Sequence, residues 1–340
     1  MIKEIIIMMV TLLACAGCSR SGSQGALKQF TKTGEFFGAE VRLDVCYENR
    51  EEAKLNQAVN TIWSRFADIH RRMSVYDPGS DINKINNAYE DSVLVGADTY
   101  QLIKDSVSYH KISNNVFDIS IGPLLMLWKE SQKRNSLPSA EEIKAAQDKL
   151  GVAYIALLPD NHIRLVKQGM KINVDSIGDG YAADEAARIL RNFGFENFLI
   201  DASGELYGGG KNCHGNLWRI GIRDPLDPVA LMEVVYVSNA AVSTSGNYER
   251  YYEVEGQRFS HIINPLTGYP HNEILSATVI APSAQFADFW STALCVLNAE
   301  EGRKLTDSFN NDYASMVIVE EENGSTKTFP SRQFSQFQKH

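Results

Sequence analysis

Positive charge is scarce in this sequence. The 33 Lys and Arg residues are outnumbered by 42 Asp and Glu, which gives a formal net charge of -9 and an isoelectric point near 5.4. Proteins that bind nucleic acids usually carry a basic excess, so the composition argues against a nucleic-acid partner. With 340 residues, of which 44% are hydrophobic, the chain can bury a sizeable core in one large domain or two intimate ones.

Cysteine is also scarce, and the cysteines lie far apart. Apart from the N-terminal Cys15 and Cys18, the sequence contains Cys46, Cys213 and Cys295. These three are odd in number and show no C-x-x-C spacing, so we expect neither a disulfide framework nor a zinc site. Cys295 lies in an apolar helical run and is most simply a small buried residue.

No apolar run is long enough to span a bilayer. The run from Ile5 to Ala14 has ten residues, which suits the hydrophobic region of a signal peptide. The "CAGC" that follows resembles the bacterial lipobox, in which Cys18 is lipidated, although Cys15 stands where Leu is usual. We therefore predict a signal peptide over 1–18, a flexible tether over 19–33 and a lipid-anchored protein facing the periplasm or another extracytoplasmic space. The membrane, inner or outer, stays open, and an ordinary secretory signal with an incidental Cys is the alternative.

The stretch "INVDSIGDGYAAD" (172–184) contains no Lys or Arg. Its pattern predicts a short strand that turns, through two glycines, into a helix. Such a turn often binds phosphate, because unpaired N–H groups and the helix dipole meet there. Asp175 and Asp179 make this turn acidic instead. The structural alternative for Asp179 is that it caps the first helical turn and complements the dipole.

Hydrophobic periodicity indicates an α+β fold with mixed, largely antiparallel sheets and packed helices. Helices are expected near 51–72, 97–113, 138–150 and 300–309, after the acidic turn, and from Ser283 onward. Strands are expected near 36–47, 153–158, 162–166, 196–201, 217–222, 230–243, 258–263, 312–319 and 325–329, and at "SATVIAP". Most of these strands have hairpin spacing, which favours antiparallel pairing.

Two oxygen-bearing residues, Asp288 and Thr292, are four positions apart in "ADFWSTALCVL". On a helix they share one face, among apolar neighbours. A partly buried carboxylate needs a partner, and a divalent cation such as Mg²⁺ is one. The alternative, a surface Asp with a Thr that bonds back to its own helix, stays open.

Three other segments could also carry chemistry. His261 is expected at a strand end beside a rigid turn, where it could transfer a proton or simply bond to its own turn. Asp118 follows Phe117 in an apolar stretch and should accept from a backbone or ligand donor, or cap a turn. Ser243–Glu253 is rich in small hydroxyl residues, which could bind an anion or form a bend between strands.

Taken together and in this order, these segments resemble the ApbE family of flavin transferases. Members of that family are periplasm-facing lipoproteins that split FAD with Mg²⁺ and attach FMN to a Thr or Ser of a target protein. The resemblance extends over about residues 34–330, and we place the domain at 34–335. The segments that carry it are "HIINPLTG", "ADFWSTA", "SVYDPGSDINKIN", "VFDISIGPLLMLW" and "SGELYGGG", the last with Glu205 where the family has Asp.

The resemblance implies roles for particular residues. It implies one or two Mg²⁺ ions, with Asp288, Thr292 and the carbonyl of Ser176 as ligands. His261 would help the acceptor hydroxyl to attack the phosphate. The residues that would line the FAD site are Phe37, Tyr76, Val116, Phe117, Asp118, Asn173, Asp179 and Ile263. The acceptor would be a Thr- or Ser-bearing extracytoplasmic subunit of a flavin-dependent electron-transfer system.

Two positions depart from the family pattern. The family turn is typically D-L-G-x-I-A-K-G-Y-A-x-D, but here Asn173 replaces the first Asp and Asp179 replaces the Lys. The family Lys contacts FAD, so this replacement reverses a charge near the ligand. Three outcomes follow from it: the enzyme still works with the metal compensating, Asp179 helps to hold a cation, or the protein binds flavin and transfers it poorly or not at all. Two other functions stay open: an FAD pyrophosphatase that uses water in place of the acceptor, and a flavin-binding or trafficking lipoprotein without turnover.

Overall fold

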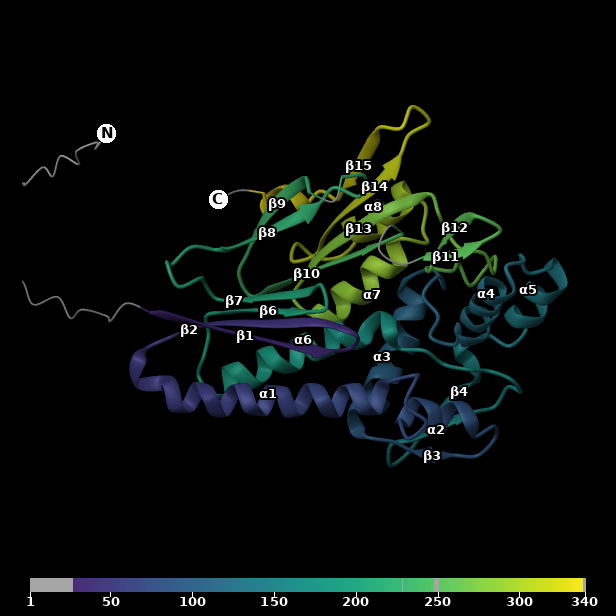
Figure 1. Cartoon of the computed structure of the whole chain (residues 1–340), viewed down its shortest axis with the longest axis horizontal. Helices are drawn as coiled ribbons and strands as arrows, with labels where there is room; N and C mark the ends of the chain where they lie inside the picture. The colour runs from purple at the N-terminus through teal and green to yellow at the C-terminus, as the bar shows by residue number, and fades with distance from the viewer. Residues whose placement is uncertain (1–26, 228, 248–250, 339–340) are drawn as a thin grey trace, which may run out of the picture.

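The computed structural model describes residues 27–227, 229–247 and 251–338. Its largest element is an eight-stranded sheet in the order β1-β2-β6-β7-β10-β13-β14-β15, with every neighbouring pair antiparallel (Figure 1). The strands are β1 (Lys28–Phe36), β2 (Ala39–Tyr47), β6 (Phe198–Ala202), β7 (Glu205–Gly209), β10 (Ala240–Gly246), β13 (Ile274–Ala281), β14 (Ala314–Glu320) and β15 (Thr326–Pro330).

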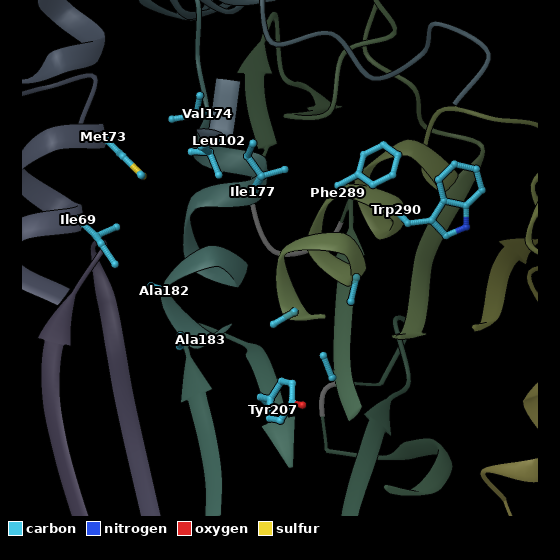
Figure 2. Close-up of a cluster of buried hydrophobic side chains, with 14 of the residues drawn as sticks. Ile69, Met73, Leu102, Val174, Ile177, Ala182, Ala183, Tyr207, Phe289 and Trp290 are labelled. Atoms are coloured by element: carbon cyan, nitrogen blue, oxygen red, sulfur yellow. The ribbon is translucent and has the colours of Figure 1, made fainter. Parts of the chain in front are cut away.

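Helices cover one face of this sheet. They are α1 (Glu52–Met73), α6 (Asp175–Asn192), α7 (Ala284–Leu294) and α8 (Ala299–Asp307). α6 packs between α1 and α7, and its alanines allow a close approach to both (Figure 2). The apolar stripe of α1 is buried as its periodicity predicts, and it consists of Leu55, Val59, Ile62, Phe66 and Ile69.

The opposite face of the sheet is covered by a hairpin of β8 (Trp218–Arg223) and β9 (Leu231–Val237). Trp218 and Val235 pack there against residues of β13 and β14, such as Ile280 and Met316. Because both faces of β13 are covered, all of its residues are buried.

A smaller lobe lies at one end of the molecule (Figure 1). It contains α4 (Gly122–Arg134), α5 (Ala140–Gln147), β11 (Tyr251–Val254) and β12 (Gln257–Ser260). Its core is centred on Trp128, whose Nε1 donates to the carbonyl of Gly268 over 3.0 Å. The remaining elements are α2 (Asp81–Asn87), α3 (Ala97–Ile112) and a three-stranded sheet of β3 (Val93–Leu94), β5 (His162–Leu165) and β4 (Ile155–Leu158).

The α+β prediction with largely antiparallel sheets is confirmed, and several boundaries differ from those expected. The strand expected at 36–47 is the second half of a hairpin, whose turn residues Phe37 and Gly38 both have positive φ, as a tight two-residue hairpin turn requires. β1 begins at Lys28, so part of the expected tether over 19–33 is strand and the domain starts before residue 34. The strand expected at 230–243 is two strands, and α4 was not predicted.

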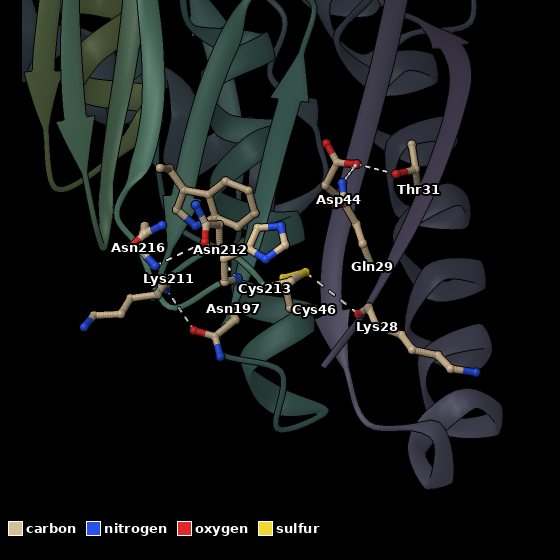
Figure 3. The surroundings of a disulfide bond; sticks show 12 residues. Lys28, Gln29, Thr31, Asp44, Cys46, Asn197, Lys211, Asn212, Cys213 and Asn216 are labelled. Atoms are coloured by element: carbon tan, nitrogen blue, oxygen red, sulfur yellow. Dashed lines mark hydrogen bonds between the residues drawn. A yellow bond between two sulfur atoms is a disulfide. The ribbon is translucent and has the colours of Figure 1, made fainter. Parts of the chain in front are cut away.

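The expectation of no disulfide is wrong, because Cys46 and Cys213 are bonded to each other (Figure 3). They are 167 residues apart in sequence. Cys46 is the second-last residue of β2, beside β6, and the loop that follows β7 brings Cys213 to the same end of these strands. Spacing along the chain cannot show such a pairing, since it depends on the strand order. Cys295 is free and buried, as predicted.

The predicted signal peptide, the lipidated Cys18 and the first part of the tether lie outside the described residues. Among the residues that the structure describes, none of the helices is both long enough and apolar enough to cross a membrane.

Candidate functional site

The start of α6 and the middle of α7 lie in direct contact. The backbone N–H of Gly180 donates to Oδ2 of Asp288 over 3.0 Å. A Cβ added at Gly180 would lie 2.4 Å from the carbonyl oxygen of Ala284, so only glycine allows this approach. Gly178 has no such neighbour within 4 Å. The second glycine of the acidic turn is therefore required by helix packing rather than by a phosphate.

Asp288 is buried, so the surface alternative for this residue is wrong. Burial, the largest cause, raises the pKa of its carboxyl to about 7, and the charges of Asp175 and Asp184 act in the same direction. The hydrogen bond from Gly180 opposes the rise. Because Oδ2 accepts that bond, Oδ1 is the oxygen that faces no donor among the described residues. A carboxylate in this setting needs a positive partner when it is ionised.

Thr292 lies one turn further along α7, on the same face as Asp288. Its Oγ1 lies 3.2 Å from Oγ of Ser245 on β10, so Thr292 is held by the neighbouring strand. Ser243 and Ser245 both contact Ser291 of α7, at 3.0 Å and 2.8 Å. Residues 243–246 were expected to belong to an anion-binding segment or a bend. They lie instead in strand β10, and the hydroxyls of Ser243 and Ser245 face α7.

Ser176 is the second residue of α6 and is half-buried. In a regular α-helix the N–H of Gly180 would donate to the carbonyl of Ser176. The bond from Gly180 to Asp288 competes for that single hydrogen. The Ser176 carbonyl is thus less firmly held by its own helix, in keeping with a role as a ligand.

The first turn of α7 is fixed by Asp184, the last residue of the stretch 172–184. Its carboxylate accepts from Oγ of Ser283 at 2.7 Å and from the backbone N–H groups of Ala284 and Gln285 at 2.8 and 3.0 Å. Burial raises the pKa of Asp184, and these three bonds oppose the rise. By capping α7, Asp184 sets the position of Asp288 one turn later.

The segment 116–121 lies against the residues that precede α6, where an isolated bridge between Ile121 and Lys171 stands in place of the short strand that was expected. The N–H of Asn173 donates to the carbonyl of Ile119 over 2.7 Å. Val116 and Phe117 are buried in the main core. The carboxylate of Asp118 accepts from the N–H and the hydroxyl of Ser120, which is the turn role considered as the alternative. Burial raises the pKa of Asp118, and the bonds from Ser120 oppose the rise.

His261 follows β12 directly and is half-buried. The segment after it turns back on itself, since Ile263 bridges Pro270 and the N–H of His271 donates to the carbonyl of Ile262 over 3.0 Å. Nδ1 of His271 donates in turn to the carbonyl of Cys295 over 2.8 Å. Because Cys295 follows α7, these bonds hold the His261 segment beside the end of the helix that carries Thr292.

Phe37 and Tyr76 lie near the end of α1. Phe37, in the β1–β2 turn, packs against Phe66 and His70 with ring centroids 5.9 and 5.7 Å away. Tyr76 is 77% exposed, and Nζ of Lys129 lies 5.2 Å from its ring centroid. Tyr76 therefore presents an open aromatic face, whereas Phe37 is largely part of the core.

Asn173 makes local bonds to Asp175. Its Oδ1 accepts from the N–H of Asp175 at 2.8 Å, and its Nδ2 donates to Oδ2 at 3.0 Å. Helix α6 starts at Asp175, so this residue, rather than Asp179, is the acid of the first turn. Asp179 is half-buried in the second turn, and its charge is felt by Glu205 on β7. The Asn173 side chain therefore stabilises the start of α6 through its two bonds to Asp175.

Several residues at the site were missed by sequence reasoning. Oε2 of Glu205 is buried and has no hydrogen-bond partner, and burial together with Asp288 raises its pKa well above the usual value. Asn86 binds both the N–H and the carbonyl of Ile172, at 2.7 and 2.9 Å, and so fixes the segment before α6. Both residues stand in the quoted segments "SGELYGGG" and "SVYDPGSDINKIN", and those segments were the available signal.

The donor set for a cation and the position of the hollow in this part of the chain both limit the candidate site. Among the described residues, no three His, Cys, Asp or Glu side chains gather where they could hold one metal ion. Any cation at Asp288 must therefore use hydroxyl and carbonyl oxygens as well. A hollow of about 420 Å³ between α1 and α6 contains none of the predicted site residues, and its Arg65 is bonded to Asp98, Glu185 and Tyr181.

Comparison with known proteins identifies the family of this chain. Residues 37–317 match the ApbE family. The chain is 32% identical over 274 residues to the FAD:protein FMN transferase of Escherichia coli K12, covering 78% of this chain and 77% of that one. It superimposes on the ApbE protein of Thermotoga maritima with a TM-score of 0.81 and 31% identity, covering 92% and 100% of the two chains. The flavin transferase ApbE of Vibrio cholerae shares the fold, with a TM-score of 0.80, 24% identity, and coverage of 92% and 99%. The chain therefore belongs to the ApbE family of transferase enzymes.

Proposed function

We propose that this protein is an FAD:protein FMN transferase, which moves FMN from FAD to the hydroxyl of a Thr or Ser on a partner protein. The observation that carries the proposal is the buried, unneutralised Asp288 carboxyl, placed one helical turn from Thr292 and bonded to the start of α6. A carboxyl so placed favours a cation, and a cation favours a diphosphate.

Mg²⁺ is the cation that this donor set fits. Asp288, Thr292 and the carbonyl of Ser176 offer three oxygens of the kind that Mg²⁺ prefers, and leave positions for phosphate oxygens and water. When bound, Mg²⁺ would neutralise charge on the diphosphate of FAD.

His261 is proposed as the base. The acceptor hydroxyl oxygen forms a bond to the phosphorus of the FMN half, the bond to the bridging oxygen breaks, and AMP leaves with that oxygen. The hydroxyl proton passes to the imidazole of His261. The two bonds that hold the His261 segment beside the end of α7 support this assignment.

The flavin half is proposed to lie along the 116–118 segment and the exposed ring of Tyr76, with Phe37 and Ile263 behind them. Tyr76 offers the open aromatic face that a flavin ring could stack on. Asn173 and Asp179 would lie nearer the diphosphate, because both belong to the start of α6.

Asp179 supports a further candidate. Its negative charge, which acts on the Glu205 carboxyl, works against a bound anion. The chain would then bind flavin without turnover, and hydrolysis of FAD to FMN and AMP with water in place of the acceptor is the other alternative.

We also propose that the protein is an exported lipoprotein, anchored through Cys18 and facing the periplasm or another extracytoplasmic space. The Cys46–Cys213 disulfide supports export, because such bonds persist in oxidising compartments. The acceptor is then an extracytoplasmic electron-transfer subunit.

One incubation separates the three activities. The purified protein is mixed with FAD, Mg²⁺ and a Thr-bearing acceptor domain, and the products are resolved on a gel and by chromatography. A covalent fluorescent band on the acceptor supports the transferase. Free AMP without a band supports the pyrophosphatase, and bound flavin with neither product supports the binding protein. A His261→Ala variant serves as the control for the proposed base.

A further inference from the structure

A chain of hydroxyl groups connects the candidate cation site to the interior of the sheet. Oγ1 of Thr292 lies 3.2 Å from Oγ of Ser245, which lies 2.8 Å from Oγ of Ser291. Ser291 also lies 3.0 Å from Oγ of Ser243 and donates to the carbonyl of Asp288 over 3.0 Å. Ser243 and Ser291 are fully buried, so water does not complete these bonds.

The direction of each bond follows from counting hydrogens, since a hydroxyl has one to donate. The carbonyl of Asp288 can only accept, so the hydrogen of Ser291 goes to it. Ser245 must then donate to Ser291. With the hydrogen of Ser245 used, the bond between Thr292 and Ser245 can be made only by the hydrogen of Thr292.

We propose that Ser245 and Ser291 are positioning residues of the candidate cation site, which hold the Thr292 hydroxyl with its hydrogen turned inward and its oxygen lone pairs turned toward the cation. The inference rests on the proposed function, because it takes Thr292 as a cation ligand. Residues that orient a metal ligand in this way usually matter almost as much as the ligand itself.

Calorimetric titration of the full chain with MgCl₂, without FAD or acceptor, tests the positioning role. Ser245→Ala should lower the Mg²⁺ affinity by about ten- to a hundredfold, and Ser245→Thr, which restores a hydroxyl, should recover it. The matched control is Thr244→Val on the same strand. It removes a 2.8 Å bond to Thr278 that does not reach the site, and should leave the affinity unchanged. Thermal denaturation identifies any variant that fails to fold.

Thr292→Val distinguishes an error in the proposed cation site from an error in the proposed positioning role. If this variant keeps the Mg²⁺ affinity, the proposed cation site itself is wrong. If it loses affinity but Ser245→Ala and Ser291→Ala do not, the site stands and the positioning role is overturned.

Discussion

Gly180 and Asp288 join the two helices of the candidate site, because the N–H of one donates to the carboxylate of the other over 3.0 Å. This bond competes with the usual helical acceptor for the Gly180 N–H, and it joins α6 to a side chain 108 positions later in the chain. The acidic turn and the helix of the "ADFWSTA" segment therefore form one unit. A change in either segment should affect cation binding at the candidate site.

Gly180→Ala should damage this unit. The new Cβ would lie 2.4 Å from the Ala284 carbonyl oxygen and 2.8 Å from Cβ of Asp288, so α6 and α7 must separate. Overpacking of this kind costs about 1–3 kcal/mol in the free energy of unfolding. We expect a loss of that size in urea denaturation, together with weaker Mg²⁺ binding.

Gly178→Ala is the matched control two positions earlier. Nothing lies within 4 Å of its added Cβ, and alanine favours a helix over glycine by up to about 1 kcal/mol. This variant should be as stable as the wild type or more stable. A loss equal to that of Gly180→Ala would show that the effect comes from the turn and not from the contact between helices.

Asp288 should make the stability of the cation-free protein depend on pH. Burial raises its pKa from 3.8 to about 7 on folding. An acid that binds its proton more tightly when folded stabilises the fold at low pH, and this contribution is lost as the pH rises from about 4 to about 7. Mg²⁺ binds the ionised form, so the stabilisation by added Mg²⁺ should increase over the same range.

The measurement is urea denaturation of the wild type and Asp288→Asn at several pH values, with and without Mg²⁺. Glu205, Asp118 and Asp184 also have raised pKa values, so only the difference between the two proteins isolates Asp288. A difference that is independent of pH would contradict the assignment.

The Cys46–Cys213 disulfide should contribute to stability but not to cation binding. It closes a loop of 167 residues, and removal of such a bond usually costs about 2–5 kcal/mol. The double variant Cys46→Ser/Cys213→Ser should lower the denaturation midpoint and leave the Mg²⁺ affinity unchanged. A reducing agent should destabilise the wild type in the same way and have no effect on the variant, because Cys295, the other cysteine of the described residues, is free and buried.

Sequence reasoning located most of the elements because their apolar periodicity is strong, as in α1. It placed Asp288 and Thr292 on one helical face for the same reason. It missed α4, where the apolar stretch after Gly122-Pro123 showed no clear period. It also missed the disulfide, because Cys46 and Cys213 meet only through the strand order β2-β6-β7.

The site was harder to predict than the fold, because its supporting residues act through contacts between distant segments. Nothing local marks Ser245 as the partner of Thr292, or Asp184 as the cap of α7. Glu205 was visible only as a departure from the family pattern, and its burial follows from the pairing of β7 with β6 and β10. Motifs thus indicated the candidate ligands, and only the packing revealed the residues that hold them in place.

Asp179→Lys should place a positive charge near the start of α6. It should change the affinity for FAD and the affinity for Mg²⁺ in opposite directions. Asp179 is half-buried, and its charge acts on the Glu205 carboxyl. Solvent and salt therefore screen this charge only partly. A lysine there would attract the diphosphate and repel the cation. FAD affinity without Mg²⁺ should therefore rise, and Mg²⁺ affinity without FAD should fall. Flavin fluorescence titration and calorimetry measure the two effects.

Glu322→Lys, an exposed reversal of the same charge in the turn between β14 and β15, is the control for net charge. If both variants change FAD affinity equally, the effect is long-range and Asp179 does not face the ligand.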